Sequence, residues 1–390
     1  MAQYDFDRVI DREGTNSIKL GYLKDEFGRE DLTALWVADM DFATPPFVLE
    51  ALHERLDRLV LGYSRTPADY YQTVSRWVGE RHGWNTDPSW YDFIPGIVRG
   101  LGLVVNHFTK PGDKVIIQPP VYHPFRLIPE GNGREVVFNP LRETAEGLYE
   151  MDFDNLAEVC DEQCKLFVLC NPHNPGGVVW SKETLQRLAH FAVEHHLLVV
   201  SDEIHCDLAL FGHKHIPFAS VSEEATQCSI TFQAPSKTFN IAGMVSSYAI
   251  VPNEELRKDF FGWLEANEFD YPPSFSTLAT QVAFENGEEW RRQMLSYVEG
   301  NVLFVEDYLQ REIPSIKAIR PQASFLIWLD CRALGLSQTE LVDLFVNKAR
   351  LALNDGSMFG PGGEGHMRLN VGCPRSILAK ALQQLKEAIG

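Results

Sequence analysis

The sequence predicts an α/β protein whose large domain has a mainly parallel sheet flanked by helices. Three apolar runs, at residues 166–170, 197–201 and 229–232, each lead directly into polar residues. Apolar runs of this kind alternate with helical patterns along the chain, which is typical of βαβ units with parallel strands. Ligands bind beyond the carboxyl ends of the strands in such sheets. The polar residues after the three runs are therefore candidates for a functional site.

The first elements follow from the apolar pattern. Residues 1–45 are expected to form an irregular arm with one apolar patch at 35–37. Further strands are expected at 115–117 and 247–251. A helix should follow Ser181, a favourable N-cap, because the next apolar residues fall at helical spacing: Leu185, Leu188, Ala189 and Ala192.

A different pattern begins near residue 286. A long helix is expected because one apolar stripe persists over several turns, formed by Trp290, Met294, Val298, Val302, Val305 and Leu309. A strand at 324–329 and a helix opened by the capping box of Ser337 and Glu340 should follow. The chain then shows a strand at 366–371 and a final helix with the core-facing residues Ile377, Ala381, Leu382, Leu385 and Ile389.

These patterns divide the chain into three parts. Residues 1–45 form an N-terminal arm that contributes to the small domain, 46–285 form the large domain, and 286–390 form a smaller α+β domain. The length of 390 residues fits two or three domains.

Composition excludes several classes of function. The net charge of −19 argues against nucleic acid or an anionic membrane as a partner, although it leaves an anionic small-molecule substrate open. No apolar run is long enough to cross a bilayer, and the polar start lacks a signal-peptide core. Seven cysteines without zinc-type spacing indicate reduced thiols in a cytoplasmic protein.

Lys237 is the most informative candidate. It lies in the segment 233–240, just beyond the strand expected at 229–232. A lysine without other evidence is usually a solvated surface charge. Here little other charge surrounds it, and an amine near low-dielectric surroundings loses its proton more easily. Such an amine is a nucleophile for an aldehyde.

Asp202 and Asn174 follow the two preceding strands. Asp202 is either a turn residue at a strand end or a functional carboxylate, and Asn174 is either a structural member of the rigid turn 171–177 or an amide donor; Asn171 is more easily read as structural. An amine, a carboxylate and an amide at one sheet edge are what pyridoxal phosphate requires. The lysine reacts with its aldehyde, and the aspartate keeps its pyridine nitrogen protonated.

Four further residues each allow two interpretations, one structural and one functional. His205 is a satisfied buried histidine or a donor to the ring hydroxyl of the cofactor, and Tyr122 is a loop aromatic or a ring that stacks on it. Gly96 starts an ordinary helix or a phosphate site at a helix N-terminus. Arg368 is an internal ion-pair partner or a bidentate clamp on a substrate carboxylate. The histidines lack metal-site spacing, so no metal is expected.

Taken together, the motifs resemble the fold-type-I pyridoxal-phosphate enzymes, the aspartate-aminotransferase-like superfamily, over nearly the whole chain. The match is closest to the branch of carbon–sulfur β-lyases similar to cystathionine β-lyase and the maltose-regulon modulator. The strings that carry it are Leu35-Trp-Val-Ala-Asp-Met-Asp-Phe42, Arg81-His-Gly-Trp84, Ser201-Asp-Glu-Ile-His205, Pro235-Ser-Lys-Thr-Phe-Asn240, and Met367-Arg-Leu-Asn370 followed by Cys373-Pro-Arg375.

The resemblance implies roles for the site residues. Lys237 would be the cofactor lysine and the catalytic residue, Asp202 the partner of the pyridinium nitrogen, and Arg368 the clamp on the α-carboxylate of the substrate. The cofactor would also contact Asn174, His205, Tyr122, Ser236 and the backbone of Gly96, Ile97 and Val98. Tyr63 matches a tyrosine that reaches the phosphate of the neighbouring subunit, which implies a homodimer with shared sites.

The implied activity is a pyridoxal-phosphate-dependent β-lyase that eliminates a thiol from cystathionine or another cysteine S-conjugate, giving pyruvate and ammonia. Val245 stands where many related aminotransferases place a phosphate-binding arginine, which favours a lyase. An aminotransferase remains the alternative, because it shares the first chemical steps. A regulatory binding protein with secondary lyase activity is the alternative from another class.

Overall fold

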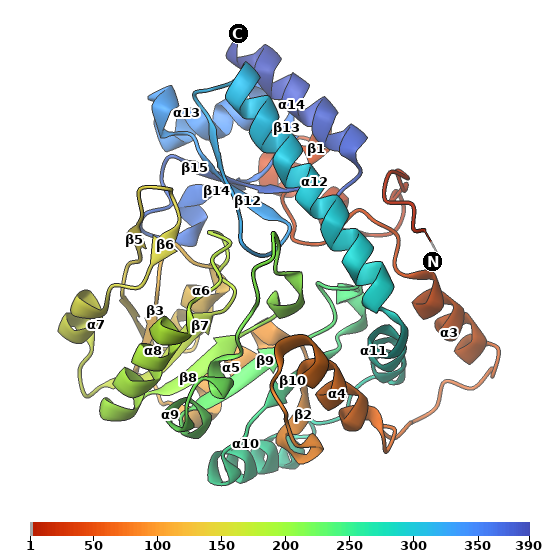
Figure 1. Cartoon of the computed structure of the whole chain (residues 1–390), viewed down its shortest axis with the longest axis vertical. Helices are drawn as coiled ribbons and strands as arrows, with labels where there is room; N and C mark the ends of the chain where they lie inside the picture. The colour runs from red at the N-terminus through yellow and green to blue at the C-terminus, as the bar shows by residue number, and fades with distance from the viewer. Residues whose placement is uncertain (1–2) are drawn as a thin grey trace.

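The computed structural model describes residues 3–390. Its larger half is built on a seven-stranded sheet with the order β2-β10-β9-β8-β7-β3-β4 (Figure 1). The strands are β2 (Tyr91–Ile94), β3 (Lys114–Ile117), β4 (Glu135–Phe138), β7 (Cys164–Cys170), β8 (Leu198–Asp202), β9 (Ser229–Gln233) and β10 (Ser247–Ile250). The predicted α/β class is confirmed, and every predicted strand of this half is present.

The sheet is mainly parallel, as predicted. The pairs β3–β4, β3–β7, β7–β8 and β8–β9 are parallel, whereas β10 runs antiparallel to both β9 and β2. In β8, Asp202 is the register partner of Cys170 in β7 and of Phe232 in β9. The carboxyl ends of the three central strands therefore lie level with one another.

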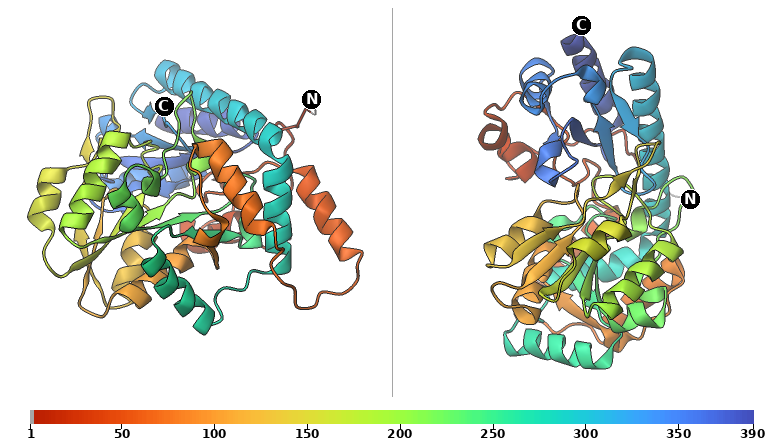
Figure 2. Two further views of the ribbon diagram at one scale, coloured as in Figure 1. Left: turned by 60° about the horizontal axis from the view of Figure 1, so that its bottom comes forward. Right: turned by 90° about the vertical axis from the view of Figure 1, so that its left-hand side faces the viewer.

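Helices cover both faces of this sheet (Figures 1 and 2). In β7, Leu166 and Val168 pack into the apolar cluster that includes residues of α5, α6 and α10, whereas Phe167 and Leu169 pack into the one that includes α8 and α9. A strand buried on both faces reads as a continuous apolar run, as found in the sequence. The helices are α3 (Pro46–Leu56), α4 (Tyr70–His82), α5 (Ile97–Phe108), α6 (Pro124–Gly131), α7 (Phe153–Val159), α8 (Lys182–Glu194), α9 (Glu223–Gln227), α10 (Glu254–Ala266) and α11 (Ser274–Asn286).

A second sheet, with the order β11-β12-β15-β14, forms the smaller half. The helix α12 (Glu288–Glu312) runs between the two halves (Figure 1). The capping box predicted at Ser337 and Glu340 is present at the start of α13. The elements of this half are β11 (Lys317–Ile319), β12 (Leu326–Asp330), α13 (Gln338–Asp343), β13 (Leu351–Ala352), β14 (Asn354–Asp355), β15 (His366–Asn370) and α14 (Arg375–Ile389).

The N-terminal arm is more ordered than the irregular segment that was expected. It contains α1 (Ile18–Gly21), α2 (Leu23–Phe27) and β1 (Thr33–Ala34), and β1 pairs in parallel with β13. A two-residue strand has too short a pattern to be recognised in the sequence. The domain limits at residues 45 and 285 stay predictions.

Short elements complete the chain. The strands β5 (Arg142–Glu143) and β6 (Tyr149–Glu150) form a hairpin. Single 3₁₀ turns lie at Pro88–Trp90, Cys206–Leu208, Phe218–Ser220, Ala242–Met244, Arg332–Leu334 and Gly356–Phe359, and a π-helical turn at Leu344–Lys348.

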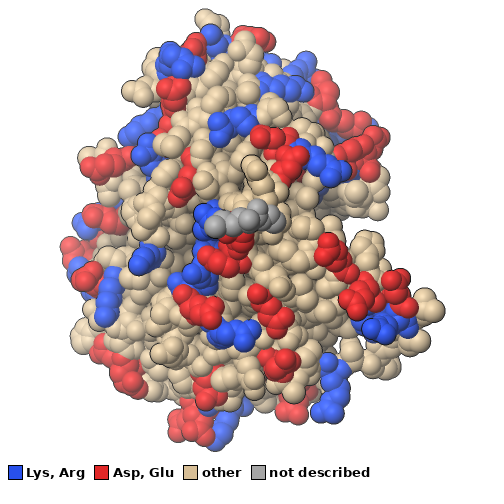
Figure 3. All heavy atoms as spheres, turned by 45° about the vertical axis from the view of Figure 1, so that its right-hand side comes forward, with Lys and Arg blue, Asp and Glu red and all other residues tan. Residues whose placement is uncertain are grey.

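The surface carries both signs of charge. On the face shown in Figure 3, acidic and basic side chains are interspersed. Within residues 3–390, no helix combines the length and the apolar character needed to cross a membrane. All seven cysteines are free thiols.

Candidate active site

A cavity of about 420 Å³ lies at the carboxyl ends of the central strands. The level strand ends explain its position, because each strand delivers the polar residue that follows it to the same edge. The cavity wall includes most of the predicted site residues: Gly96, Ile97, Val98, Tyr122, Asn174, Asp202, His205, Ser236 and Lys237. The structure thus brings together residues that span more than 140 positions of the chain.

Lys237 is partly buried, and its amine points at the N-terminal arm. Its Nζ donates a hydrogen bond of 2.5 Å to the carbonyl oxygen of Ala38. Burial, with the positive charge of Arg368 as a further cause, lowers the pKa of Lys237 to about 8. A substantial share of the amine is therefore neutral near neutral pH, which nucleophilic attack requires. The interpretation as a solvated surface lysine is wrong.

Asp202 is buried at the end of β8, and only 6% of it is exposed. Its Oδ1 accepts the N–H of Ile204 at 3.1 Å, so it also has the turn role considered from the sequence. Burial raises the pKa of Asp202 to about 7, although the charge of Lys237 opposes the rise. A cation placed in the cavity against this carboxyl would stabilise its ionised form. Asp202 therefore fits a protonated ring nitrogen.

His205 and Tyr122 line the same cavity. His205 is buried, and among the described residues its Nδ1 has no hydrogen-bond partner, so it is not a satisfied core histidine. Burial, followed by the charges of Lys237 and Arg368, lowers the pKa of His205 to about 3, which keeps the ring neutral. The Tyr122 ring is fixed by an edge contact with Phe125 at 6.1 Å. Both rings are available to a planar ligand.

Gly96 opens α5 at the wall of the cavity. Its φ of +107° lies in a region that favours glycine, and this conformation turns the chain into the helix. The N–H groups of the first helical turn, including those of Ile97 and Val98, have no acceptor within a helix. They and the helix dipole favour an anion. With Ser236 in the same wall, these groups fit a phosphate.

Arg368, in β15, is 4% exposed, and its partners are neutral oxygens. It donates to Asn174 Oδ1 at 2.9 Å, to Asn354 Oδ1 at 2.6 Å and to the carbonyl of Trp36 at 3.1 Å. Its Nε is buried with no hydrogen-bond partner among residues 3–390. Burial lowers the pKa of Arg368 to about 10. Within the described part of the chain the guanidinium is therefore a buried cation without a carboxylate partner, not half of an internal ion pair, and it fits an anionic ligand.

Asn171 and Asn174 lie in different surroundings. Asn171 is fully buried, and its amide donates to the carbonyl of Ile216 at 3.0 Å, which is a structural contact. Asn174 lines the cavity and also accepts from Arg368. The rigid turn between Cys170 and Gly177 thus supports one structural and one cavity-facing amide.

The sequence analysis missed Ala38 as a cavity residue. Ala38 belongs to residues 36–42, which we call the N-terminal strap because they cross from the small half to the cavity. An alanine carries no chemical signal, so only the structure shows that its carbonyl meets Lys237. Val245 also lines the cavity, with its backbone in the left-handed region at a φ of 55°.

Tyr63 does not join the other predicted residues. It is fully exposed and lies outside the cavity of the single chain. Its predicted contact is with a second subunit and stays a prediction.

A buried cluster next to the site contains His82, Cys206 and Asp207, whose ligand-type atoms lie within 4.8 Å of one another. No metal was expected from the sequence. The carboxylate of Asp207 accepts the indole N–H of Trp77 at 3.1 Å and the hydroxyl of Thr238 at 3.1 Å. Because Thr238 follows Lys237, we interpret the cluster as a network that supports the lysine loop.

The sequence and the fold are similar to those of known proteins. The chain is 44% identical to cystathionine beta-lyase PatB of Bacillus subtilis over 386 residues, which is 99% of this chain and 100% of the relative. Cystalysin from Treponema denticola, whose crystal structure contains pyridoxal 5′-phosphate, matches with a TM-score of 0.95, 34% identity and 99% of both chains. A PLP-bound C–S lyase from Staphylococcus hominis matches with a TM-score of 0.90, 35% identity, and 100% of this chain and 98% of that one.

A family match covers most of the sequence. Residues 30–385 match the family described as aminotransferase class I and II. This range contains both sheets and every residue of the cavity wall, and the fold agrees with that predicted from the motifs. The chain belongs to the aminotransferase class I and II family.

Proposed function

We propose that this protein is a pyridoxal-phosphate-dependent carbon–sulfur β-lyase that acts on cystathionine or another cysteine S-conjugate. The observation that carries the proposal is the convergence of Lys237 and Asp202 in one cavity. The buried guanidinium of Arg368 does not line this cavity, but it donates a hydrogen bond to Asn174 of the cavity wall. The names of the relatives, cystathionine beta-lyase and C–S lyase, support the reaction class.

The cavity fits pyridoxal phosphate in each of its parts. The first turn of α5 and Ser236 would hold the phosphate, and Asp202 would pair with the ring nitrogen. Tyr122 would stack on the ring, with Asn174 and His205 near the ring oxygen. When bound, the cofactor supplies an electron sink for negative charge at the Cα of an attached amino acid.

The side chains of the protein would perform the remaining work. Arg368 binds the α-carboxylate of the substrate and so aligns the amino acid with the cavity. Lys237, whose amine is easily deprotonated, removes the proton from Cα. Asp202 keeps the proton on the ring nitrogen and thereby favours charge delocalisation. The thiolate then leaves from Cβ and takes up a proton to become the thiol. Water hydrolyses the remaining three-carbon unit to pyruvate and ammonia.

An aminotransferase is the principal alternative. It would use Lys237, Asp202 and Arg368 for the same first steps, but Lys237 would return the proton to the cofactor. Val245 favours a lyase, because its side chain cannot bind phosphate where many aminotransferases have an arginine. A regulatory binding protein with secondary lyase activity is the other alternative; its binding would survive loss of Lys237, whereas catalysis would not.

We also propose a homodimer with shared active sites. The segment that ends at Tyr63 exposes Leu59, Val60 and Leu61, with 87%, 70% and 62% of each residue accessible. Consecutive exposed apolar residues are typical of a contact surface. When a second subunit covers this segment, the Tyr63 hydroxyl would contact the phosphate of the cofactor bound in that second subunit. A cytoplasmic location stays a prediction.

The function is tested by product analysis. The purified protein, loaded with pyridoxal phosphate, is incubated with a panel of cysteine S-conjugates without an added keto acid. The proposal predicts equal amounts of pyruvate and thiol over many turnovers. Product formation only when a keto acid is supplied, with a new amino acid as the second product, would instead establish the aminotransferase.

A further inference from the structure

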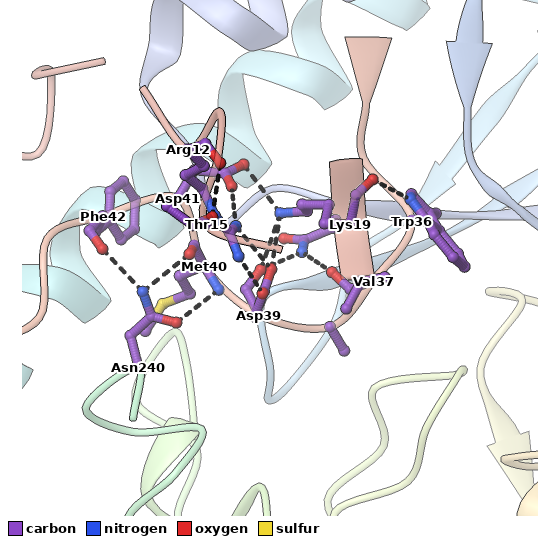
Figure 4. Close-up of polar contacts among 12 residues, drawn as sticks. Arg12, Thr15, Lys19, Trp36, Val37, Asp39, Met40, Asp41, Phe42 and Asn240 are labelled. Atoms are coloured by element: carbon purple, nitrogen blue, oxygen red, sulfur yellow. Dashed lines mark hydrogen bonds and ion pairs between the residues drawn. The ribbon is translucent and has the colours of Figure 1, made fainter. Parts of the chain in front are cut away.

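The N-terminal strap is held in place by side chains from both halves of the protein (Figure 4). Asn370 donates to the carbonyl oxygens of Val37 and Asp39, both at 2.7 Å. Asn240 accepts from the backbone N–H of Met40 at 3.0 Å and donates to its carbonyl at 2.9 Å. These contacts fix the backbone on either side of Ala38 without touching that residue.

The strap also carries two carboxylates that are paired with two cations (Figure 4). Lys19 Nζ lies 2.9 Å from Asp41 Oδ2 and 3.2 Å from Asp39 Oδ1, and it donates to the carbonyl of Asp39 at 3.1 Å. Arg12 lies 2.7 Å from Asp39 Oδ2 and 2.9 Å from Asp41 Oδ1. Each carboxylate therefore contacts both cations, and the formal charges balance.

Lys19 is the unusual member of this cluster, because only 1% of its side chain is exposed. Burying an ammonium group costs several kcal/mol unless it is paired and hydrogen-bonded. Even a well-paired buried ion pair is weak evidence for stability, since an apolar replacement often does as well. Its better-attested use is to specify one arrangement of the chain. The arrangement specified here is that of the strap.

The strap matters for the site because the two carbonyl groups held by Asn370 belong to Val37 and Asp39, the residues on either side of Ala38. The Ala38 carbonyl accepts the hydrogen bond from Lys237 Nζ. Two charges of this cluster also act on the Lys237 amine. The charge of Asp39 raises the pKa of Lys237, and that of Lys19 lowers it. The other charges that act on the amine are those of Arg368 on β15 and Asp202 on β8.

We propose that Lys19 is a positioning residue: by neutralising Asp39 and Asp41 inside the protein, it fixes the strap so that the Ala38 carbonyl holds the Lys237 amine. This inference rests on the proposed role of Lys237. Among residues 3–390, no hydrogen bond or ion pair joins Lys19 to the cavity wall, so it acts through the strap and not on the substrate.

Hydrogen exchange of the full-length protein, with and without pyridoxal phosphate, tests this role. The reporters are the amides of Met40 and Asp41, which donate to Asn240 Oδ1 at 3.0 Å and to the carbonyl of Gly372 at 2.7 Å. In Lys19→Met, methionine preserves most of the volume but leaves two carboxylates with one guanidinium. The two amides should exchange at least about tenfold faster, while the amides of β7 stay unchanged.

Two further variants make the test specific. Lys24→Met is the matched control, because Lys24 lies on the same arm with 72% of its side chain exposed; it should exchange like the wild type. Lys19→Met combined with Asp41→Asn restores one cation to one carboxylate and should recover most of the protection. This balanced variant also serves if the single variant does not fold.

A labelling measurement connects the strap to Lys237. In the cofactor-free protein, Lys19→Met should slow the reaction of Lys237 with an amine-directed reagent at pH 8. The unbalanced charge of Asp39 then favours the protonated amine, and Asp41→Asn should reverse part of the loss. Unchanged labelling in a variant with faster strap exchange would overturn the link between Lys19 and Lys237.

The remaining outcomes are equally decisive. If the amides of Met40 and Asp41 exchange as slowly in Lys19→Met as in the wild type, Lys19 only fills space. Faster exchange throughout the chain, including β7, or no recovery in the balanced variant would also overturn the proposal. Failure of the wild type to bind pyridoxal phosphate would count against the proposed function instead, because exchange in the cofactor-free protein reports on the strap alone.

Discussion

Cys170 and Asp202 are register partners at the carboxyl ends of β7 and β8. Because the strands end level, the turn that follows Cys170 brings Asn174 to the cavity wall that also contains Asp202. Asn174 in turn accepts a hydrogen bond from Arg368, which comes from the other sheet. The register of β7 and β8 therefore connects Asp202, the proposed partner of the cofactor nitrogen, through Asn174 to Arg368, the proposed carboxylate-binding residue.

Asp202→Asn should reduce turnover far more than it reduces cofactor content. An amide has no charge to favour a protonated ring nitrogen, so negative charge at Cα is less stabilised. The expected loss in kcat is about 10²–10³-fold, as for other electrostatic groups in closed sites. Steady-state kinetics with cofactor content measured by absorbance checks this. Asp307→Asn on α12, where 70% of the side chain is exposed, is the control. A change of only a few-fold would leave Asp202 with its turn role alone.

The same substitution should stabilise the cofactor-free protein in a pH-dependent way. Burial raises the pKa of Asp202 to about 7, so the folded state binds more protons than the unfolded state between about pH 4 and pH 7. The stability contributed by the protonated carboxyl is present at low pH and is lost as the pH rises through 7. The amide of Asp202→Asn does not ionise, so the variant does not lose this stability. It should melt about 5 °C higher than the wild type at pH 8.

Thermal unfolding of both cofactor-free proteins across this range measures the effect. The difference in Tm should shrink toward pH 5, where the wild-type carboxyl is largely protonated. A difference that does not vary with pH would mean that burial does not perturb Asp202 as described.

Arg368→Lys should weaken substrate binding while leaving the cofactor bound. Lysine keeps the charge but cannot make two parallel hydrogen bonds to a carboxylate. The loss of one charge-assisted hydrogen bond, about 1.5–3 kcal/mol, corresponds to a rise in KM of about 10–100-fold. Arg311→Lys, at an exposed ion pair with Asp307, is the control. An unchanged KM would show that the free Nε of Arg368 does not serve the substrate.

Tyr63→Phe should loosen the cofactor by about one or two powers of ten, because a phenol–phosphate hydrogen bond is worth roughly 1.5–3 kcal/mol when desolvated. Cofactor titration measures the change. Tyr271→Phe, with 67% of the residue exposed, is the control.

A mixed dimer of Tyr63→Phe and Lys237→Ala subunits tests whether Tyr63 acts across the interface. If it does, the site of the Lys237→Ala subunit also receives the Tyr63→Phe side chain of its partner, so that one site carries both defects. The other site then has both Lys237 and Tyr63 and stays intact.

The mixture should therefore regain activity beyond either parent. A verified mixed dimer without recovery, or a fully active monomer on sedimentation, would rule out shared sites.

The strand ends were predictable from the sequence because they combine two strong signals. In 166–170, 197–201 and 229–232, an apolar run stops at a polar residue, and parallel strands necessarily bring their carboxyl ends to one edge. Asp202 and Lys237 could be placed by this reasoning alone. The roles of the strand-end residues needed the family resemblance, since Asn174 and His205 each had an equally good structural explanation.

The N-terminal arm was the part that sequence reasoning did not resolve. Lys19 has no local sign of burial, because its partners Asp39 and Asp41 stand twenty or more residues away. Ala38 contributes a carbonyl group, which every residue possesses. The neutral surroundings of Arg368 were equally hidden, since Asn354 and Trp36 are brought to it by the sheet and the strap. Tertiary contacts determined all three.

Reductive trapping of the cofactor tests the central claim most directly. The yellow protein, loaded with pyridoxal phosphate, is treated with borohydride and digested, and the modified peptide is identified by mass spectrometry. The account predicts one pyridoxyl group per chain on Lys237, and none in Lys237→Ala; the control Lys258→Ala, at an exposed lysine, should be labelled like the wild type. A wild type that stays colourless with the cofactor, or a label on a different lysine, would contradict it.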